Sequence, residues 1–155
     1  RLGAEMSVKA SLPRARGYTS YTVVDAEFRK GAFDGNRIPG TPAQQLSAGV
    51  GVSPLPRWWV DLDWHLVNDF YRVNDLNNAL PKADNYGVLN MLIRYTVPSR
   101  WIRRRWPDLE AYARIDNITK EEYVTFQSSN ALNSTGAGEN PMPSTSFLGG
   151  IRLKF

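Results

Sequence analysis

The 155-residue sequence contains no cysteine, a single histidine and no long hydrophobic run. Without cysteine, neither a disulfide nor a thiolate metal site can form. No run of apolar residues approaches the roughly 20 that a transmembrane helix requires. If the chain enters a membrane, it must do so as part of a β-barrel, because only helices and closed barrels satisfy every backbone polar group in lipid.

The charge distribution gives no sign of nucleic-acid binding. The net charge is +4, and part of the excess lies in one short segment, residues 100–105. No basic stripe interleaved with aromatic residues runs along any predicted element, so we predict no nucleic-acid partner and no cofactor. The chain begins at Arg1 without a methionine or a signal peptide and within a strand-like pattern, which favours a piece of a longer precursor.

Alternation of apolar and polar residues dominates the sequence, whereas helical periodicity is weak throughout. The alternation recurs about seven times and predicts an all-β, antiparallel fold. The predicted strands cover residues 2–12, 21–29, 45–52, 58–70, 89–97, 109–116 and 145–155. Long, polar connections are expected over 30–42, 72–84 and 119–144, and short turns over 13–17 and 53–57; the basic connection 98–107 is of intermediate length.

Two features favour a transmembrane barrel over a soluble β-sandwich. The fourth predicted strand places Trp58, Val60 and Trp64 on one face and charged groups on the other, and a packed protein core would have to pair every one of those charges. A wet or plugged barrel interior tolerates them. Long and short connections also alternate, as in outer-membrane barrels with outer loops and periplasmic turns. We therefore expect the apolar faces to contact lipid and the C-terminus to be periplasmic.

Aromatic residues near the predicted strand ends fit the boundaries of a bilayer. Trp58 and Phe70 bracket the fourth strand and would span about 30 Å at a tilt of about 40°. Trp58, Trp101 and Trp106 lie at the predicted periplasmic end beside arginines, which suits a headgroup boundary. The alternative is an exposed basic turn with incidental tryptophans.

The closing strand, residues 145–155, ends the chain on an aromatic residue. Its apolar face is typical of the assembly signal of bacterial outer-membrane barrels, which the barrel assembly machinery reads. Seven strands do not close a bacterial single-chain barrel, which normally has an even number. The chain is thus expected to form the C-terminal third of a larger barrel. The residues assigned to the assembly signal are Phe147, Ile151, Leu153 and Phe155.

The order of several short motifs resembles the C-terminal barrel of TonB-dependent receptors. Residues 21–28, followed by the loop 35–42 and a strand containing Gln45 and Leu46, are similar to a strand-loop-strand pattern of that family. Residues 86–95 resemble a later strand, and residues 113–123 resemble an Asn-to-Tyr segment of the family, with Ile118 at a position usually held by Leu or Phe. Pro141-Met-Pro143 resembles the entry to the last strand, although Ser144 replaces the usual arginine.

This resemblance implies a 22-stranded barrel that is filled by an N-terminal plug. Such receptors bind a scarce ligand, most commonly a ferric siderophore or other metal chelate, and import it with energy from the inner-membrane TonB complex. The implied partners are the plug and the N-terminal barrel strands of the same receptor, the TonB complex, outer-membrane lipid and a small-molecule ligand. The implied compartment is the outer membrane of a Gram-negative bacterium.

Candidate site residues fall into two groups. The first group is predicted to face the barrel lumen and to pair with the plug: Asp61, Asp63, His65, Arg94, Glu110, Arg114 and Asp116. One histidine with carboxylates along a single strand is a poor metal site, so no metal is predicted. The second group is placed in the outer loops as candidate ligand contacts, with a solvated loop as the alternative for each: Arg37, Tyr71, Arg72, Asn77, Phe126 and Asn130.

No catalytic arrangement stands out, since no nucleophile–base pair or phosphate-binding loop is present, and we predict that the protein is not an enzyme. Three alternatives remain open at this point. A passive outer-membrane channel or structural barrel would lack the plug. A barrel enzyme would need a Ser/His or Asp/His pair at the outer rim, whereas the only histidine lies in mid-strand. A soluble β-sandwich is the last alternative.

Overall fold

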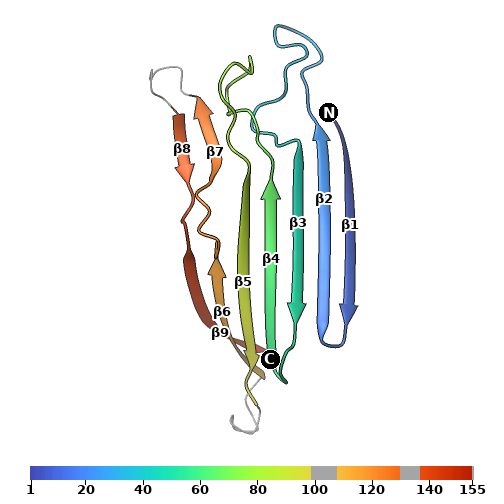
Figure 1. Cartoon of the computed structure of the whole chain (residues 1–155), viewed down its shortest axis with the longest axis vertical. Helices are drawn as coiled ribbons and strands as arrows, with labels where there is room; N and C mark the ends of the chain where they lie inside the picture. Colours follow the sequence, from blue (N-terminus) through green and yellow to red (C-terminus); the bar gives the residue numbers. More distant parts are fainter. Residues whose placement is uncertain (99–107, 130–136, 155) are drawn as a thin grey trace.

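The computed structural model describes residues 1–98, 108–129 and 137–154, and within them the chain is built of strands without a helix. Among these residues, no helix has the length and hydrophobicity needed to cross a bilayer. Figure 1 shows the strands lying side by side along one long axis. The nine strands are β1 (Leu2–Leu12), β2 (Ala15–Asp25), β3 (Gln44–Val52), β4 (Trp58–Val67), β5 (Tyr86–Thr96), β6 (Asp108–Asp116), β7 (Val124–Ser129), β8 (Ala137–Pro141) and β9 (Ser146–Lys154).

Seven of the strands form one antiparallel sheet in the order β1-β2-β3-β4-β5-β6-β9. Each strand pairs with its predecessor in the chain, except that β9 pairs with β6 because the small β7–β8 hairpin lies between them in sequence. The predicted all-β, seven-stranded antiparallel segment is therefore confirmed. The loop expected over 119–144 contains the β7–β8 hairpin, which sequence analysis missed because that stretch is rich in Ser, Asn and Gly.

The connections differ in length at the two ends of the sheet. Figure 1 shows the β2–β3 loop, the β4–β5 loop and the β7–β8 hairpin at one end, which we call the loop end. At the other end, the turn end, Pro13 and Arg14 alone join β1 to β2. The backbone N–H of Ser53 donates to the Arg14 carbonyl at 2.8 Å and thereby joins the β3–β4 turn to the β1–β2 turn. Long loops and short turns thus alternate from β1 to β5 as the sequence predicted, whereas the connection from β5, which ends at Thr96, to β6, which begins at Asp108, is longer than the alternation predicts.

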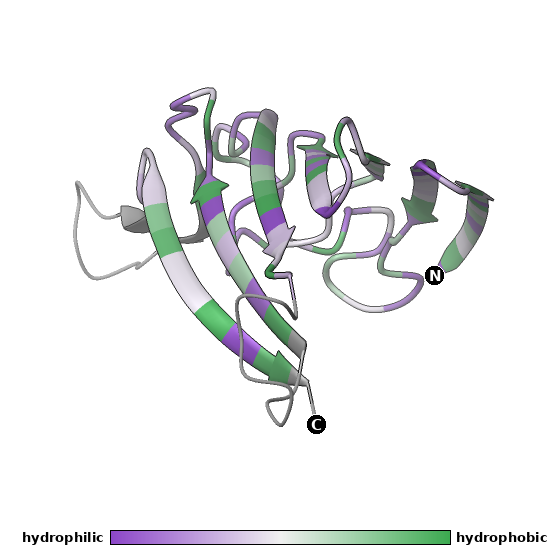
Figure 2. Cartoon of the chain, turned by 90° about the horizontal axis from the view of Figure 1, so that it is seen from below, coloured by the Kyte–Doolittle hydropathy of each residue, from purple (hydrophilic) through white to green (hydrophobic). Residues whose placement is uncertain are grey.

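The strand register separates the side chains into two faces of opposite character. Rows such as Val8–Thr19–Ala48–Trp64–Leu89 run across neighbouring strands on one side of the sheet. We call this side the apolar face; it carries the even-numbered residues of β1, β3 and β4 and the odd-numbered residues of β2, β5, β6 and β9. The alternate residues form the polar face. Figure 2 shows hydrophobic and hydrophilic residues alternating along the strands of the curved sheet.

Large hydrophobic side chains on the apolar face are exposed rather than covered by another layer. Leu2 is 75% exposed, Ile151 70% and Trp64 49%. Monomeric soluble proteins rarely expose a contiguous apolar surface of this kind, and such a patch marks an interaction with protein or membrane. On β9, the predicted signal residues Phe147, Ile151 and Leu153 all lie on this face. Phe155, Trp101 and Trp106 lie outside the described residues.

The structure corrects the bounds of several predicted strands. The fifth begins at Tyr86 rather than 89, and the second covers Ala15–Asp25 rather than 21–29, so the turn predicted over 13–17 is shorter than expected. The second strand ends early because from Ala26 onward the chain bonds within its own loop: Ile38 N–H donates to the Ala26 carbonyl at 2.8 Å, and Phe28 N–H donates to the Asn36 carbonyl at 2.9 Å. These hydrogen bonds occupy backbone groups that would otherwise continue the pairing of the second strand with its neighbours.

The fourth strand ends at Val67, so Phe70 does not extend its apolar face. Phe70 forms an isolated bridge with Ala83 and packs in a small buried cluster with Val67, Ala83 and Tyr86. The estimate of about 30 Å from Trp58 to Phe70 was therefore wrong, because Phe70 does not mark the end of the apolar face of β4. The physical reason is that Asn68 and Asp69 interrupt the alternation and start the turn into the loop.

The sheet is open at both sides. Among the described residues, β1 pairs with β2 alone and β9 pairs with β6 alone. Each of these edge strands therefore presents a row of backbone groups that the sheet itself does not satisfy.

Candidate functional site

The polar face contains side-chain pairs that reach across an intervening strand. Arg16 on β2 and Asp61 on β4 both pair in register with Gly51 on β3. A Cβ atom at Gly51 would lie 2.9 Å from Arg16 Nε and would also crowd the Asp61 carboxylate. The absence of a side chain at Gly51 therefore lets Arg16 contact Asp61, and Arg16 Nε donates to Asp61 Oδ1 at 2.9 Å.

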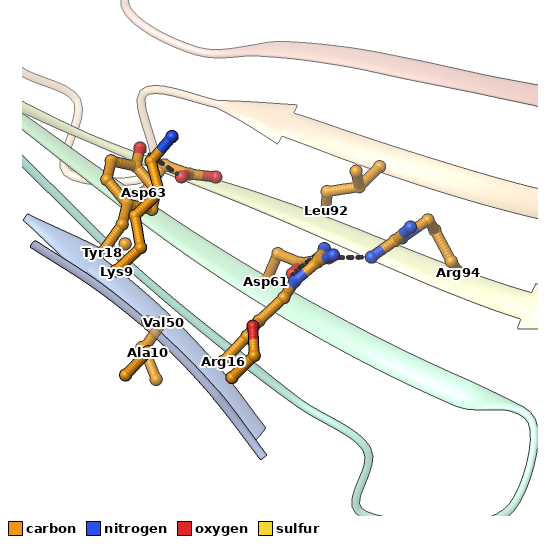
Figure 3. Close-up of a pocket in the computed structure, with 13 residues that line it drawn as sticks. Lys9, Ala10, Arg16, Tyr18, Val50, Asp61, Asp63, Leu92 and Arg94 are labelled. Carbon is orange, nitrogen blue, oxygen red and sulfur yellow. Dashed lines mark hydrogen bonds and ion pairs between the residues drawn. The ribbon is translucent and has the colours of Figure 1, made fainter. Parts of the chain in front are cut away.

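Asp61 holds a second arginine on its other oxygen, as Figure 3 shows. Arg94 on β5 donates to Asp61 Oδ2 at 2.7 Å. The Asp61 side chain is 9% exposed, against 22% for Arg94 and 48% for Arg16. The two guanidinium groups compensate the charge of the buried carboxylate, so removal of one member would leave an unpaired buried charge. Arg94 Nε is buried and has no hydrogen-bond partner within the described residues, so this cluster still holds an unused donor.

Two further cross-strand rows follow the first toward the loop end. Tyr18 on β2 donates to Asp63 Oδ1 on β4 at 2.7 Å, and the pair passes over Gly49, where a Cβ atom would lie 2.7 Å from that same oxygen. In the next row, Ser47 Oγ and His65 Nδ1 are 2.8 Å apart. Because Gly49 and Gly51 of β3 have no side chain, side chains of β2 and β4 can contact each other across β3.

The first two rows line a hollow of about 350 Å³ on the polar face. The hollow is lined by three cations, Lys9, Arg16 and Arg94, and by the carboxylates of Asp61 and Asp63. Lys9 lies by Tyr18, with which it pairs in register, and not beside Arg94 (Figure 3). Next to the hollow, the Arg16 guanidinium stands 5.2 Å from the ring centroid of Trp59. Four residues of this region were not among the predicted sites: Lys9, Arg16, Tyr18 and Trp59. Lys9 and Trp59 lie on the polar faces of predicted strands, which was the available signal for them, whereas Arg16 fell in the predicted turn 13–17 and Tyr18 before the predicted second strand.

The remaining predicted polar-face residues are paired but not gathered into one site. Glu110 is buried, and Arg152 on the neighbouring β9 approaches it at 3.4 Å. Arg114 Nε donates to Asp116 on its own strand at 2.7 Å. Asp61, Asp63 and His65 share a face, but each bonds to a different partner. Within residues 1–98, 108–129 and 137–154, no three His, Asp or Glu side chains are grouped closely enough to hold a metal ion.

At the loop end, the structure brings two of the predicted loop residues together. Arg37 and Tyr71 both line a hollow of about 220 Å³, together with Asp69 and Lys82. Lys82 Nζ lies 2.9 Å from the Asp69 carboxylate and 5.1 Å from the centroid of the Tyr71 ring. Arg37 forms a longer contact of 3.7 Å with Asp25.

The other predicted loop residues do not join this hollow. Arg72 and Asn77 belong to the same loop as Tyr71 but lie outside the lining of the hollow, and Arg72 Nε is buried without a partner in the described part of the chain. Phe126 lies in β7, and Asn130 lies outside the described residues.

Asn117 organises the base of the connection between β6 and β9. Its backbone is left-handed, with φ of 55°, and its side chain is buried. The side-chain amide donates to the Glu121 carbonyl at 2.8 Å and to the Pro143 carbonyl at 3.2 Å, while its oxygen accepts from Glu121 N–H at 2.9 Å. One side chain therefore joins both ends of this long connection.

Tyr123 lies just beyond this turn and stacks on Tyr86, with ring centroids 4.6 Å apart. Burial, with a smaller contribution from the Asp116 carboxylate, raises the pKa of Tyr123 above its ordinary value of 10.0. The ring pair is therefore neutral at neutral pH, and it borders a hollow of about 500 Å³ that His65 and Arg114 also line.

An open antiparallel sheet with an exposed apolar face and an ion-paired polar face defines a segment of a β-barrel wall. The profile of the TonB dependent receptor-like β-barrel family matches residues 2–118 of this chain. The chain belongs to that family, as the motif order predicted.

Solved structures similar to the chain have the same fold. The unliganded ferric citrate transporter FecA is 22% identical, with a TM-score of 0.70 over 92% of this chain. The ferric-catecholate import receptor Fiu from K12 E. coli is 18% identical, with a TM-score of 0.76 over 99%. The ferric yersiniabactin uptake receptor FyuA from Yersinia pestis is 16% identical, with a TM-score of 0.71 over 96%. The chain spans about a fifth of each of these proteins, namely 21%, 20% and 22%.

Proposed function

We propose that this chain is part of the barrel wall of an outer-membrane receptor that imports a scarce ligand with energy from the TonB complex. The observation that carries the proposal is the contrast between the two faces of the sheet in a member of the TonB-dependent receptor-like family. Exposed apolar side chains such as Val8 and Trp64, which lie in one row across the strands, suit hydrocarbon. A polar face that buries Asp61 and Glu110 with arginine partners suits the inside of a barrel.

The sheet requires additional strands to serve this role. Each backbone group left unpaired in lipid costs several kcal/mol, so the open edges of β1 and β9 need partners. We propose that the remaining strands of a 22-stranded barrel supply them. In this barrel the loop end is extracellular, the turn end and the C-terminus are periplasmic, and the barrel assembly machinery inserts the protein into the outer membrane.

The hollow on the polar face fits an acidic surface of a plug domain. Lys9, Arg16 and Arg94 bring three cations to the hollow, whereas Asp61 and Asp63 bring two carboxylates. The half-exposed Arg16 side chain and the exposed Lys9 are donors that an acidic side chain of the plug can reach. We extend the plug-facing proposal to His65, Glu110, Arg114 and Asp116 because they lie on the same face of the sheet.

The ligand is proposed to be a ferric siderophore or another metal chelate, and the loop end is proposed to bind it. Support for the ligand class comes from the structural neighbours, which are named for ferric citrate, ferric catecholate and ferric yersiniabactin. Support for the location comes from Arg37, Tyr71 and Lys82, which offer cationic and aromatic groups beside one hollow. Such groups suit anionic, conjugated chelates.

Uptake of labelled iron tests the proposal. The gene for the full-length protein is deleted from its source bacterium, and uptake of iron is measured from citrate, catecholate and yersiniabactin complexes. The proposal predicts that at least one complex is imported only when both the receptor and TonB are present. Uptake through the receptor that continues without TonB would identify a passive channel, and unchanged uptake of all three complexes would contradict the proposed ligand class.

A further inference from the structure

One asparagine side chain makes two of the hydrogen bonds that join the β2–β3 loop to the β4–β5 loop. Asn78 Oδ1 accepts from the backbone N–H of Arg37 at 2.7 Å, and Asn78 Nδ2 donates to the carbonyl of the same residue at 3.0 Å. The side-chain amide therefore satisfies both backbone groups of Arg37, as a paired residue of a neighbouring strand would.

Asn78 is itself held in place by its own loop. Asn78 Nδ2 also donates to the Asp75 carbonyl at 3.1 Å, and the buried Asp75 carboxylate accepts from the backbone N–H groups of Ala79 and Leu80 at 3.0 and 3.1 Å. The φ angle of Asn78 is 54°, a left-handed conformation that asparagine adopts more readily than most residues. The amide that contacts Arg37 thus projects from a turn that is already fixed.

Two further bonds join the same loops. Asn36 Nδ2 donates to the Leu76 carbonyl at 2.9 Å, and Gly40 N–H donates to the Tyr71 carbonyl at 2.7 Å. Segment 36–40 is thereby attached to segment 71–78 at three points, and at one of them Asn78 supplies two hydrogen bonds. Arg37 and Tyr71 line the same hollow, and this attachment fixes the spacing between them.

We propose that Asn78 is a positioning residue that makes the β2–β3 and β4–β5 loops one mechanical unit with a fixed spacing between Arg37 and Tyr71. The significance of that spacing for ligand binding rests on the proposed function. The coupling itself is a property of the empty protein and can be measured without ligand, so its failure is distinguishable from the failure of the uptake proposal.

The test uses two readouts on the full-length protein in detergent micelles. The first is hydrogen exchange at the Arg37 amide, whose acceptor is Asn78 Oδ1. The second is the distribution of distances between spin labels attached to cysteines at the exposed positions 34 and 79, one on each loop; the 155 residues contain no cysteine of their own. Each readout is recorded for the parent protein and for the variants.

Three variants and one control separate the amide's role from backbone effects. Asn78→Gly removes the side chain without straining the left-handed backbone. Asn78→Asp keeps an acceptor for Arg37 N–H but removes the donor to the Arg37 carbonyl. The double variant Asn36→Ala/Asn78→Gly also removes the hydrogen bond from Asn36 to the Leu76 carbonyl. Lys120→Gly is the matched control, because Lys120 is exposed, has φ of 57° and belongs to another loop.

The expected result is graded. Asn78→Gly should raise exchange at the Arg37 amide roughly fivefold, the factor for one net hydrogen bond, and should broaden the distance distribution. Asn78→Asp should broaden the distance distribution but leave the Arg37 amide more protected from exchange than in Asn78→Gly. The double variant should broaden the distance distribution most. Lys120→Gly should change neither exchange nor the distance distribution. Unchanged exchange in Asn78→Gly would overturn the proposal, as would an unchanged distance distribution in the double variant.

Discussion

Replacing Asp61 with alanine should destabilise the barrel wall far more than the same change at Asp63, two residues along the strand. Asp61 accepts from Arg16 and Arg94, and its side chain is 9% exposed, so its removal leaves two cations without their partner. We expect a loss of about 3 kcal/mol, the lower end of the range for breaking a buried charge pair, because water can reach the half-exposed Arg16. Asp63 has one exposed bond with Tyr18, and its loss should cost about 1 kcal/mol.

Chemical unfolding of the full-length protein in detergent, followed by the loss of the β-strand circular dichroism signal, measures both changes. Double-mutant cycles refine the comparison. The coupling of Asp61 to Arg94 should exceed its coupling to Arg16, because the Arg94 side chain is 22% exposed and that of Arg16 is 48% exposed. If Asp61→Ala costs no more than Asp63→Ala, the two-arginine cluster does not support the wall and the reasoning fails.

Three further changes follow from particular residues. Gly51→Val should lower the free energy of unfolding by about 1–3 kcal/mol, because the new side chain pushes Arg16 away from Asp61. Gly17→Val should lower it less, because a Cβ atom at Gly17 would meet nothing closer than 3.5 Å. Equal losses would contradict the role given to Gly51. Asn117→Ala should lower the free energy of unfolding by about 3 kcal/mol, because it removes hydrogen bonds and leaves alanine in a left-handed conformation. Lys120→Ala shares only the left-handed conformation and should cost about 1 kcal/mol in the same unfolding assay. Deleting Phe155 should lower the amount of folded full-length protein in the outer membrane, and unchanged surface levels would count against the assembly-signal prediction.

Much of the architecture could be predicted because a strand with two different environments repeats with a period of two. Trp58, Asp61 and Trp64 were enough to assign opposite faces to β4, and the register confirms the alternation. Boundaries were less predictable. Phe70 continues the even-numbered apolar pattern, but Asn68 and Asp69 end the strand first, and Phe70 is buried under the loop instead. Local alternation does not reveal where a turn takes over the backbone hydrogen bonds.

The partners of the polar residues could not be predicted from spacing along one strand. Asp61, Asp63 and His65 look like a single cluster in the sequence, yet each has a different partner. Asp61 and Asp63 bond across β3 to Arg16 and Tyr18 of β2, whereas His65 bonds to Ser47 of β3 itself. The pairing depends on the register of three strands and on the glycines at positions 49 and 51. The loop–loop attachment through Asn78 was likewise unpredictable, because it joins residues 41 positions apart in two irregular segments.

Quenching of tryptophan fluorescence by brominated lipid tests the central claim, that the apolar face contacts a bilayer and the polar face does not. Trp64 lies on the apolar face and is 49% exposed, whereas Trp59 lies on the polar face of the same strand beside Arg16. Two variants of the full-length protein, each retaining only one of these tryptophans, are reconstituted in vesicles whose acyl chains carry bromine. The account predicts strong quenching of Trp64 and little quenching of Trp59. Equal quenching of the two, or stronger quenching of Trp59, would contradict it.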